Sequence, residues 1–204
     1  MICLLPLALV AGPRGPVAVV DGDTLRVGGT LVRLHGIDAP EMAQTCGGGF
    51  RCGVWAQQMV AAHLGGRFAT CNDLGTDVYG RVLATCDVGG SDVGQWIVQQ
   101  GLAIAFRRYA QTYVPAEQAA FAAGRGLHGM QMQSPSAYRR AKAEVQEAAP
   151  DGCVIKGNIS LKGRIYHVPG QAFYATTRVR PQQGERWFCT EQEAQAAGWR
   201  RAQR

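Results

Sequence analysis

The sequence predicts an α+β protein that is mainly β, built as a small barrel with about three helices and followed by a small α/β unit. Short β-branched or alternating segments recur between glycine-rich turns, as in small barrels. Few stretches carry apolar residues at helical spacing. The composition becomes polar, Ala-rich and charged over residues 134–152, which sets residues 153–204 apart.

The expected strands are short and lie between turn signals. Gly28-Gly29 separates two alternating segments and predicts a two-residue hairpin. Residues 38–53, rich in glycine, form an expected loop, and so do residues 72–81. We predict strands over residues 16–20, 24–27, 30–35, 67–71, 82–88 and 102–106.

Three helices are expected in the same part of the chain. The first covers residues 54–64, where Trp55 and Met59 begin an apolar face. The second covers residues 93–100, with Ser91 or Asp92 as its N-cap. The third opens at Pro115 and runs to about Gly124.

The charge favours polyanionic partners and is unevenly distributed. The whole chain carries a net charge of +6. Residues 13–150 hold 12 Lys and Arg against 11 Asp and Glu, whereas residues 151–204 hold 9 against 4. The second unit therefore carries most of the positive charge, and contact with an anionic polymer through residues 153–204 is one expectation.

The cysteines and the chain start suggest an exported protein. Residues 1–12 are apolar and end in small residues, so we interpret them as a signal peptide or its remnant, with a buried strand as the alternative. Six further cysteines suit disulfides in an oxidising compartment, and no C-x-x-C pair favours zinc. Among fifteen possible connectivities, the spacing favours the local pairs Cys46 with Cys52, Cys71 with Cys86, and Cys153 with Cys189.

One stretch concentrates the residues suited to chemistry. Asp23, Asp38 and Glu41 are hard oxygen ligands, and Arg33 between them is a planar donor that suits a phosphate. An isolated Asp-Gly-Asp is more often an ordinary turn than a metal site. Here, however, D-G-D-T at residues 21–24 precedes an arginine, D-x-P-E at residues 38–41 and D-x-Y-G-R at residues 77–81.

This combination resembles the signature of the staphylococcal nuclease family, over roughly residues 16–140. The resemblance implies an OB-fold, a five-stranded Greek-key barrel that often binds oligonucleotides. It also implies a calcium-dependent, sugar-nonspecific nuclease that hydrolyses phosphodiester bonds in DNA and RNA and leaves 3′-phosphates. Residues 13–140 would form this catalytic domain, residues 141–152 a linker and residues 153–204 an accessory domain similar to the sunset domain behind some bacterial nuclease domains.

The resemblance also assigns the site. Asp23, Asp38 and the backbone carbonyl of Ala39 would hold Ca²⁺, and few protein ligands leave room on this ion for water and substrate. Glu41 would act as general base or orient the attacking water. The remaining expected contacts are a phosphate clamp formed by Arg33 and Arg81 and nucleotide contacts by Tyr79 and Tyr109.

Two other function classes remain open. The barrel could bind nucleic acid without cutting it, although the full set of site residues argues against this. The basic residues 153–204 could instead tether the protein to an envelope polysaccharide. We expect a monomer that is secreted or periplasmic in a bacterium, with no segment long enough to span a membrane.

Overall fold

The computed structural model describes residues 12–147, 149–150, 152–160 and 163–203. The predicted leader therefore lies, apart from its last residue, outside the described residues. The chain divides into two compact units, residues 1–138 and 139–204, which are treated separately below. Within the described part of the chain, no helix has the length and apolar character needed to cross a membrane.

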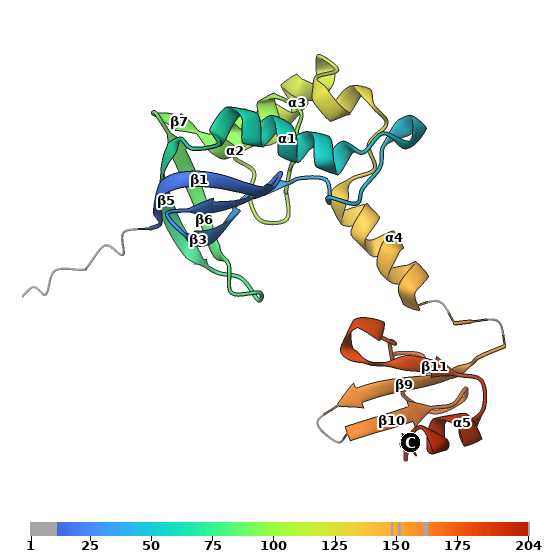
Figure 1. Cartoon of the computed structure of the whole chain (residues 1–204). Coiled ribbons are helices and arrows are strands. Elements are labelled where there is room, and N and C mark those ends of the chain that lie inside the picture. Colours follow the sequence, from blue (N-terminus) through green and yellow to red (C-terminus); the bar gives the residue numbers. More distant parts are fainter. Residues whose placement is uncertain (1–11, 148, 151, 161–162, 204) are drawn as a thin grey trace, which may run out of the picture. The chain divides into compact units, whose positions relative to one another are not determined.

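The first unit contains a closed barrel of five strands (Figure 1). Its sheet has the order β3-β2-β1-β5-β6-β7, and a parallel pairing between β3 and β6 closes the ring. This mixed, OB-like barrel confirms the predicted fold class. The five barrel strands are β1 (Arg14–Asp21), β2 (Thr24–Val27), β3 (Thr30–Leu34), β5 (Phe68–Thr76) and β6 (Val82–Val88). The short β7 (Ser91–Asp92) pairs with β6 outside the closed ring.

Helices cover the barrel on one side and fall close to the predicted ranges (Figure 1). Asp92 caps α2 by accepting a hydrogen bond from the Gln95 backbone N–H at 2.7 Å. A separate two-stranded sheet pairs Asp38 with Ile104. The elements are α1 (Cys52–Leu64), α2 (Val93–Gln99), α3 (Val114–Ala122), β4 (Ile37–Asp38), β8 (Ile104–Ala105) and the 3₁₀ turns Gly47–Gly49 and Gly126–Gly129.

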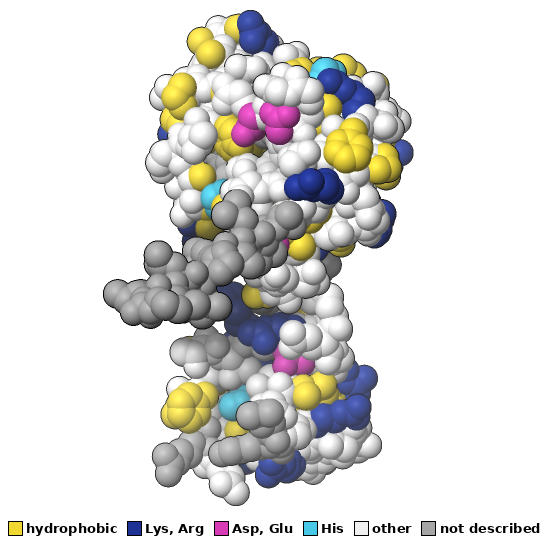
Figure 2. All heavy atoms as spheres, turned by 90° about the vertical axis from the view of Figure 1, so that its left-hand side faces the viewer, with side chains coloured by type: hydrophobic (Ala, Val, Ile, Leu, Met, Phe, Trp, Pro, Cys, Tyr) yellow, Lys and Arg dark blue, Asp and Glu magenta, His cyan; other side chains and the backbone are white. Residues whose placement is uncertain are grey.

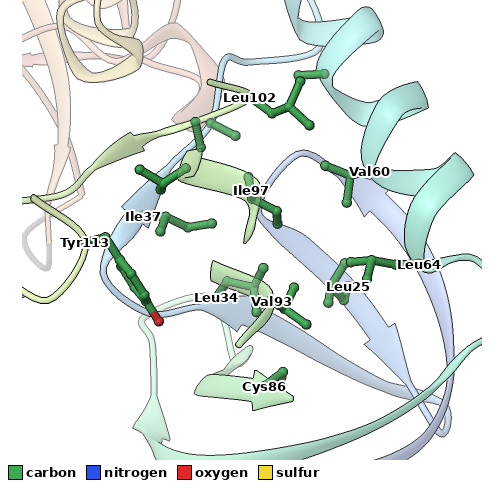
Figure 3. Packing of buried hydrophobic residues seen from close by; sticks show 14 of the residues in the cluster. Leu25, Leu34, Ile37, Val60, Leu64, Cys86, Val93, Ile97, Leu102 and Tyr113 are labelled. Atoms are coloured by element: carbon green, nitrogen blue, oxygen red, sulfur yellow. The ribbon is translucent and has the colours of Figure 1, made fainter. Parts of the chain in front are cut away.

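The core lies between the helices and the barrel (Figure 3). Leu25 and Leu34 from the barrel, Ile97 from α2 and Leu64 from α1 point into it and are almost fully buried. Burying such side chains contributes roughly 1.5–3 kcal/mol each. This packing gives the adjoining site residues a rigid support.

Two predicted boundaries were wrong. Strand β5 continues to Thr76, into the segment predicted to be a loop, because it keeps pairing with β6 through a register shift between Asp73 and Gly75. The predicted strand over residues 102–106 is only two residues long. The loop predicted for residues 72–81 is therefore a tight turn at the tip of the β5–β6 hairpin.

The second unit is a four-stranded sheet with the order β11-β9-β10-β12 and one helix against it. Its core contains Tyr166, Phe188 and Trp199, with Ile155 and Ala194. The elements are β9 (Ile155–Ser160), β10 (Gly163–His167), the 3₁₀ turn Pro181–Gln183, β11 (Arg186–Phe188), α5 (Glu191–Ala196) and β12 (Arg200–Arg201).

Helix α4 (Pro135–Glu147) occupies most of the segment whose composition suggested a partly helical linker. Its Ala, Arg, Lys, Glu and Gln residues have high intrinsic helix propensity, which accounts for the length of the helix. The structure also forms the three disulfides that the spacing favoured: Cys46–Cys52, Cys71–Cys86 and Cys153–Cys189.

Candidate active site at the edge of the barrel

The turn between β1 and β2 places Asp23 against the end of β4. The Asp23 backbone N–H donates to Asp21 Oδ1 at 3.1 Å, which closes the turn. A Cβ atom on Gly22 would lie 2.6 Å from the Cβ of Ala39, so only glycine permits this close approach. The Ala39 backbone N–H then donates to Asp23 Oδ2 at 2.7 Å.

Arg33 on β3 joins the two carboxylates. Its Nη1 donates to the carbonyls of Leu34 and Ile37, at 2.8 and 3.0 Å, which fixes the guanidinium at the turn between β3 and β4. Its Nη2 lies 2.9 Å from Asp23 Oδ2 and 3.4 Å from Asp38 Oδ1. Both carboxylates therefore converge on one guanidinium nitrogen.

Arg81 reaches the same group from the β5–β6 hairpin. Asp77 holds it through Nε at 2.8 Å and Nη2 at 2.7 Å. Arg81 Nη1 donates to Thr24 Oγ1 at 3.3 Å, and the Thr24 hydroxyl donates to Asp23 Oδ1 at 3.2 Å. An unbroken series of polar contacts thus runs from Arg81 to Asp38, although the residues come from four different segments.

Burial raises the pKa of Asp23 from 3.8 to about 7. The positive charge of Arg33 lowers this pKa, whereas the nearby carboxylate of Asp21 raises it further. The charge of Arg33 therefore does not offset the effect of burial on the Asp23 carboxylate. A bound cation would favour the ionised form of Asp23.

The donor set fits the implied Ca²⁺. Asp23 and Asp38 are buried, hard oxygen donors that contact the same guanidinium nitrogen, and Ala39 follows Asp38 directly, so its backbone carbonyl lies on the same segment. No cluster of three or more His, Cys, Asp or Glu side chains with metal-binding geometry occurs among the described residues. The site accordingly offers two carboxylates and a carbonyl, which would leave coordination positions for water and substrate.

The other predicted residues lie around this group to different extents. Glu41 is half-buried and follows Ala39 by two residues. Tyr79 is 82% exposed, and its ring centroid lies 5.5 Å from the guanidinium carbon of Arg81. Tyr109 is also exposed, but its ring contacts Phe106 rather than a residue of the group above.

Three residues that hold the candidate site together were not predicted from the sequence: Asp77, Thr24 and Gln44. Asp77 and Thr24 stand inside the recognised motifs, and their polar side chains beside arginine and aspartate were the available signal. Gln44 is fully buried and bonds the backbone of Glu41. No local pattern indicates the role of Gln44, because its other partner is Gln133, 89 positions away.

Comparison with known proteins agrees with this geometry. The family described as "Staphylococcal nuclease homologue" matches residues 31–128. The chain is also 34% identical, over 132 residues, to the "Succinoglycan biosynthesis protein ExoI" of Rhizobium meliloti (strain 1021), covering 61% of this chain and 69% of that relative. The chain belongs to the staphylococcal nuclease family.

Membership of the staphylococcal nuclease family supports a nuclease-like or nucleic-acid-related role for the first unit. A second family, described as ArfC, matches residues 133–201. This match covers the C-terminal unit in which an accessory domain was expected. The ArfC match also begins before helix α4, within the last residues of the first unit.

Proposed function

We propose that this staphylococcal nuclease family member is a calcium-dependent hydrolase of phosphodiester bonds in DNA and RNA. The observation that carries the proposal is the contact series from Arg81 through Thr24, Asp23 and Arg33 to Asp38. It combines buried acids for a cation with two guanidinium groups for a phosphate. The three disulfides support a location outside the cytoplasm, secreted or periplasmic.

Each residue has a distinct task in the proposed reaction. Arg33 and Arg81 bind the phosphate and stabilise the negative charge that develops on its oxygens in the transition state. Glu41 accepts a proton from the attacking water as the new P–O bond forms and the bond to the 5′ oxygen breaks, which leaves a 3′-phosphate. The departing oxygen takes a proton from solvent. Asp23, Asp38 and the Ala39 carbonyl would hold the Ca²⁺, which neutralises phosphate charge and activates water when bound.

The test is digestion of plasmid DNA and of RNA by the oxidised full chain, with calcium and with a chelator. Calcium-dependent digestion that falls about 10²–10⁴-fold in Glu41→Gln would support the proposal. The control is Asp87→Asn, which alters an exposed carboxylate outside the group of contacts. Calcium-dependent binding without cleavage by the wild type would favour the alternative, a binding module that does not cut.

We propose that the second unit binds the same polyanionic substrate, DNA or RNA. Two of its glutamates serve the fold: Glu185 is buried and accepts from the Ile159 and Arg180 backbone N–H groups, and Glu193 accepts the Cys189 N–H beside the cap of α5. Basic side chains are correspondingly prominent on the face of the C-terminal unit seen in Figure 2. Among the described residues from 152 onward, the exposed arginines are Arg164, Arg178, Arg180, Arg186, Arg200 and Arg201.

Two of these arginines share one face of the sheet. Arg186 on β11 and Tyr166 on β10 both pair with Gly157 on β9, so their side chains lie on the same face. Arg164 lies two residues before Tyr166 on β10 and therefore shares that face. The guanidinium of Arg186 stacks 4.6 Å from the Phe188 ring centroid, and that of Arg164 lies 6.0 Å from the Trp199 centroid. Aromatic support restricts each guanidinium and favours contact with a phosphate backbone.

The double variant Arg164→Gln/Arg186→Gln is expected to weaken DNA binding in the absence of calcium. Because each lost phosphate contact removes about 0.9 from the slope of log K against log salt, we expect the slope to become shallower by up to about 2. The measurement is fluorescence anisotropy of a labelled duplex at several salt concentrations. Arg67→Gln/Arg125→Gln removes equal charge from the first unit and is the control.

An unchanged salt slope in Arg164→Gln/Arg186→Gln would contradict the grip on nucleic acid. If the same variant then lost retention on an acidic polysaccharide, the second unit would be a tether instead. The name of the Rhizobium meliloti relative refers to succinoglycan biosynthesis, which makes this the relevant alternative polymer class. Full-length protein is used in both assays.

A further inference from the structure

The loop that carries Glu41 is held by a buried amide. Gln44 is fully buried, and its side-chain Oε1 accepts a hydrogen bond from the Glu41 backbone N–H at 3.3 Å. The backbone N–H of Gln44 donates to the Glu41 carbonyl at 2.7 Å. Its Nε2 donates to the Gln133 carbonyl at 2.7 Å. Gln44 therefore fixes the main chain of Glu41 relative to a segment far along the sequence.

The same distant segment contacts the loop at two more points. The Gly47 N–H donates to the Met130 carbonyl at 3.1 Å. The Tyr138 hydroxyl, on the first turns of α4, donates to the Ala43 carbonyl at 3.2 Å. Figure 1 shows the loop after β4 running past the start of this helix. Residues 130–138, which we call the brace segment, thus hold the loop by three hydrogen bonds.

The other end of the loop is closely packed against α1. A Cβ atom on Gly53 would lie 1.8 Å from the Glu41 carbonyl oxygen, so the helix start and the Glu41 backbone are in direct contact. The disulfide between Cys46 and Cys52 closes the loop, and Cys52 Sγ lies 3.4 Å from the Gln44 carbonyl. The start of α1 and the disulfide hold the far end of the loop. The loss of a brace contact would therefore displace the near end, where Glu41 lies.

We propose that the brace segment positions Glu41 for catalysis, with Gln44 and Tyr138 as positioning residues that act through the backbone of the loop. This inference rests on the proposed role of Glu41. The ArfC-type match begins at residue 133, inside the brace segment. The first residues of the ArfC match therefore belong to the segment that we propose positions Glu41.

The test uses Tyr138→Phe and Gln44→Met in the full chain. Small displacements of a catalytic group can cost about 10²-fold in rate. We expect kcat to fall about 5-fold in Tyr138→Phe and about 100-fold in Gln44→Met, with KM changed less than about 2-fold. The matched control is Tyr174→Phe, which removes a hydroxyl that donates to the Val154 carbonyl at 2.7 Å in the second unit, and it should leave kcat unchanged.

Two further readouts separate positioning from general destabilisation. In a Glu41→Gln background, Tyr138→Phe should cause no additional loss of kcat, because its effect passes through Glu41. Equal losses in both backgrounds would overturn the proposal. Backbone hydrogen exchange at residues 41–47 should be faster in Tyr138→Phe than in wild type or Tyr174→Phe.

The exchange measurement also stands when no cleavage is seen. Faster exchange in a protein that does not cleave nucleic acid would show the brace and refute only the nuclease proposal. Unchanged exchange in both Tyr138→Phe and Gln44→Met would refute the brace, whatever the activity. Gln44→Met is included because a water molecule could replace the hydroxyl that is lost in Tyr138→Phe and so hide its effect.

Discussion

Replacement of Arg81 by lysine is expected to lower kcat for phosphodiester cleavage by about 10³-fold. Asp77 fixes the Arg81 guanidinium at Nε and Nη2, and Thr24 ties it to Asp23 through Nη1. Lysine keeps the charge but supplies neither the planar donor pair nor these simultaneous contacts. Initial rates on a defined oligonucleotide, with calcium in excess, measure the effect.

The loss in Arg81→Lys should appear in kcat more than in KM, because the guanidinium is proposed to act on charge that grows in the transition state. Arg26→Lys is the control: Arg26 is exposed on β2 and donates to the Gly29 carbonyl. A Tm for Arg81→Lys close to that of wild type would exclude a folding defect. Full activity in Arg81→Lys would remove Arg81 from the site.

Much of the barrel was predictable from the sequence, because its elements are specified locally. Gly28-Gly29 sets the β2–β3 hairpin, and Asp92 caps α2 as one of two predicted choices. The end of β5 was not predictable. Gly75 and Thr76 look like loop residues, but they pair with Leu83 and Val82 of β6 and so belong to the strand. Tertiary pairing overrides weak local preference there.

In the candidate site, too, the local features were predictable from the sequence and the long-range contacts were not. Asp23, Arg33 and Asp38 could be named from their motifs, because their spacing is short. The contacts that orient them are long-range: Arg81 bonds Thr24 from 57 positions away, and Gln44 bonds Gln133 from 89. Which partner a polar side chain finds across such distances depends on how the strands pack, and a single sequence does not contain this information in a local pattern.

Exchange of Asp23 for asparagine is expected to lower activity without lowering the stability of the metal-free fold. Cleavage should fall by about 10³-fold or more, because one of two carboxylate donors for Ca²⁺ is lost. Asparagine still offers one oxygen to the Ala39 N–H, so the turn has an acceptor. In the chelated protein at pH 8, Tm should not decrease, since the buried charge that burial disfavours is gone.

The pH dependence of stability distinguishes this account from a simple loss of an ion pair. The folded pKa of Asp23 is raised from 3.8 to about 7, so the folded chain binds more protons than the unfolded chain between these values. The stabilisation is fully present below about pH 4 and is lost as pH rises through 7. Thermal unfolding of chelated protein from pH 4 to 8 should show this fall in wild type and a smaller one in Asp23→Asn.

Calcium should oppose this fall in stability only in proteins that keep Asp23, because the ion binds the ionised carboxylate and thereby stabilises the folded state. At pH 8 we expect added calcium to raise Tm in wild type and in the control Asp87→Asn, but not in Asp23→Asn. A calcium-induced increase that persists in Asp23→Asn would place the cation elsewhere. A marked decrease in the metal-free Tm of Asp23→Asn would mean that the contact with Arg33 outweighs the cost of burying the Asp23 charge.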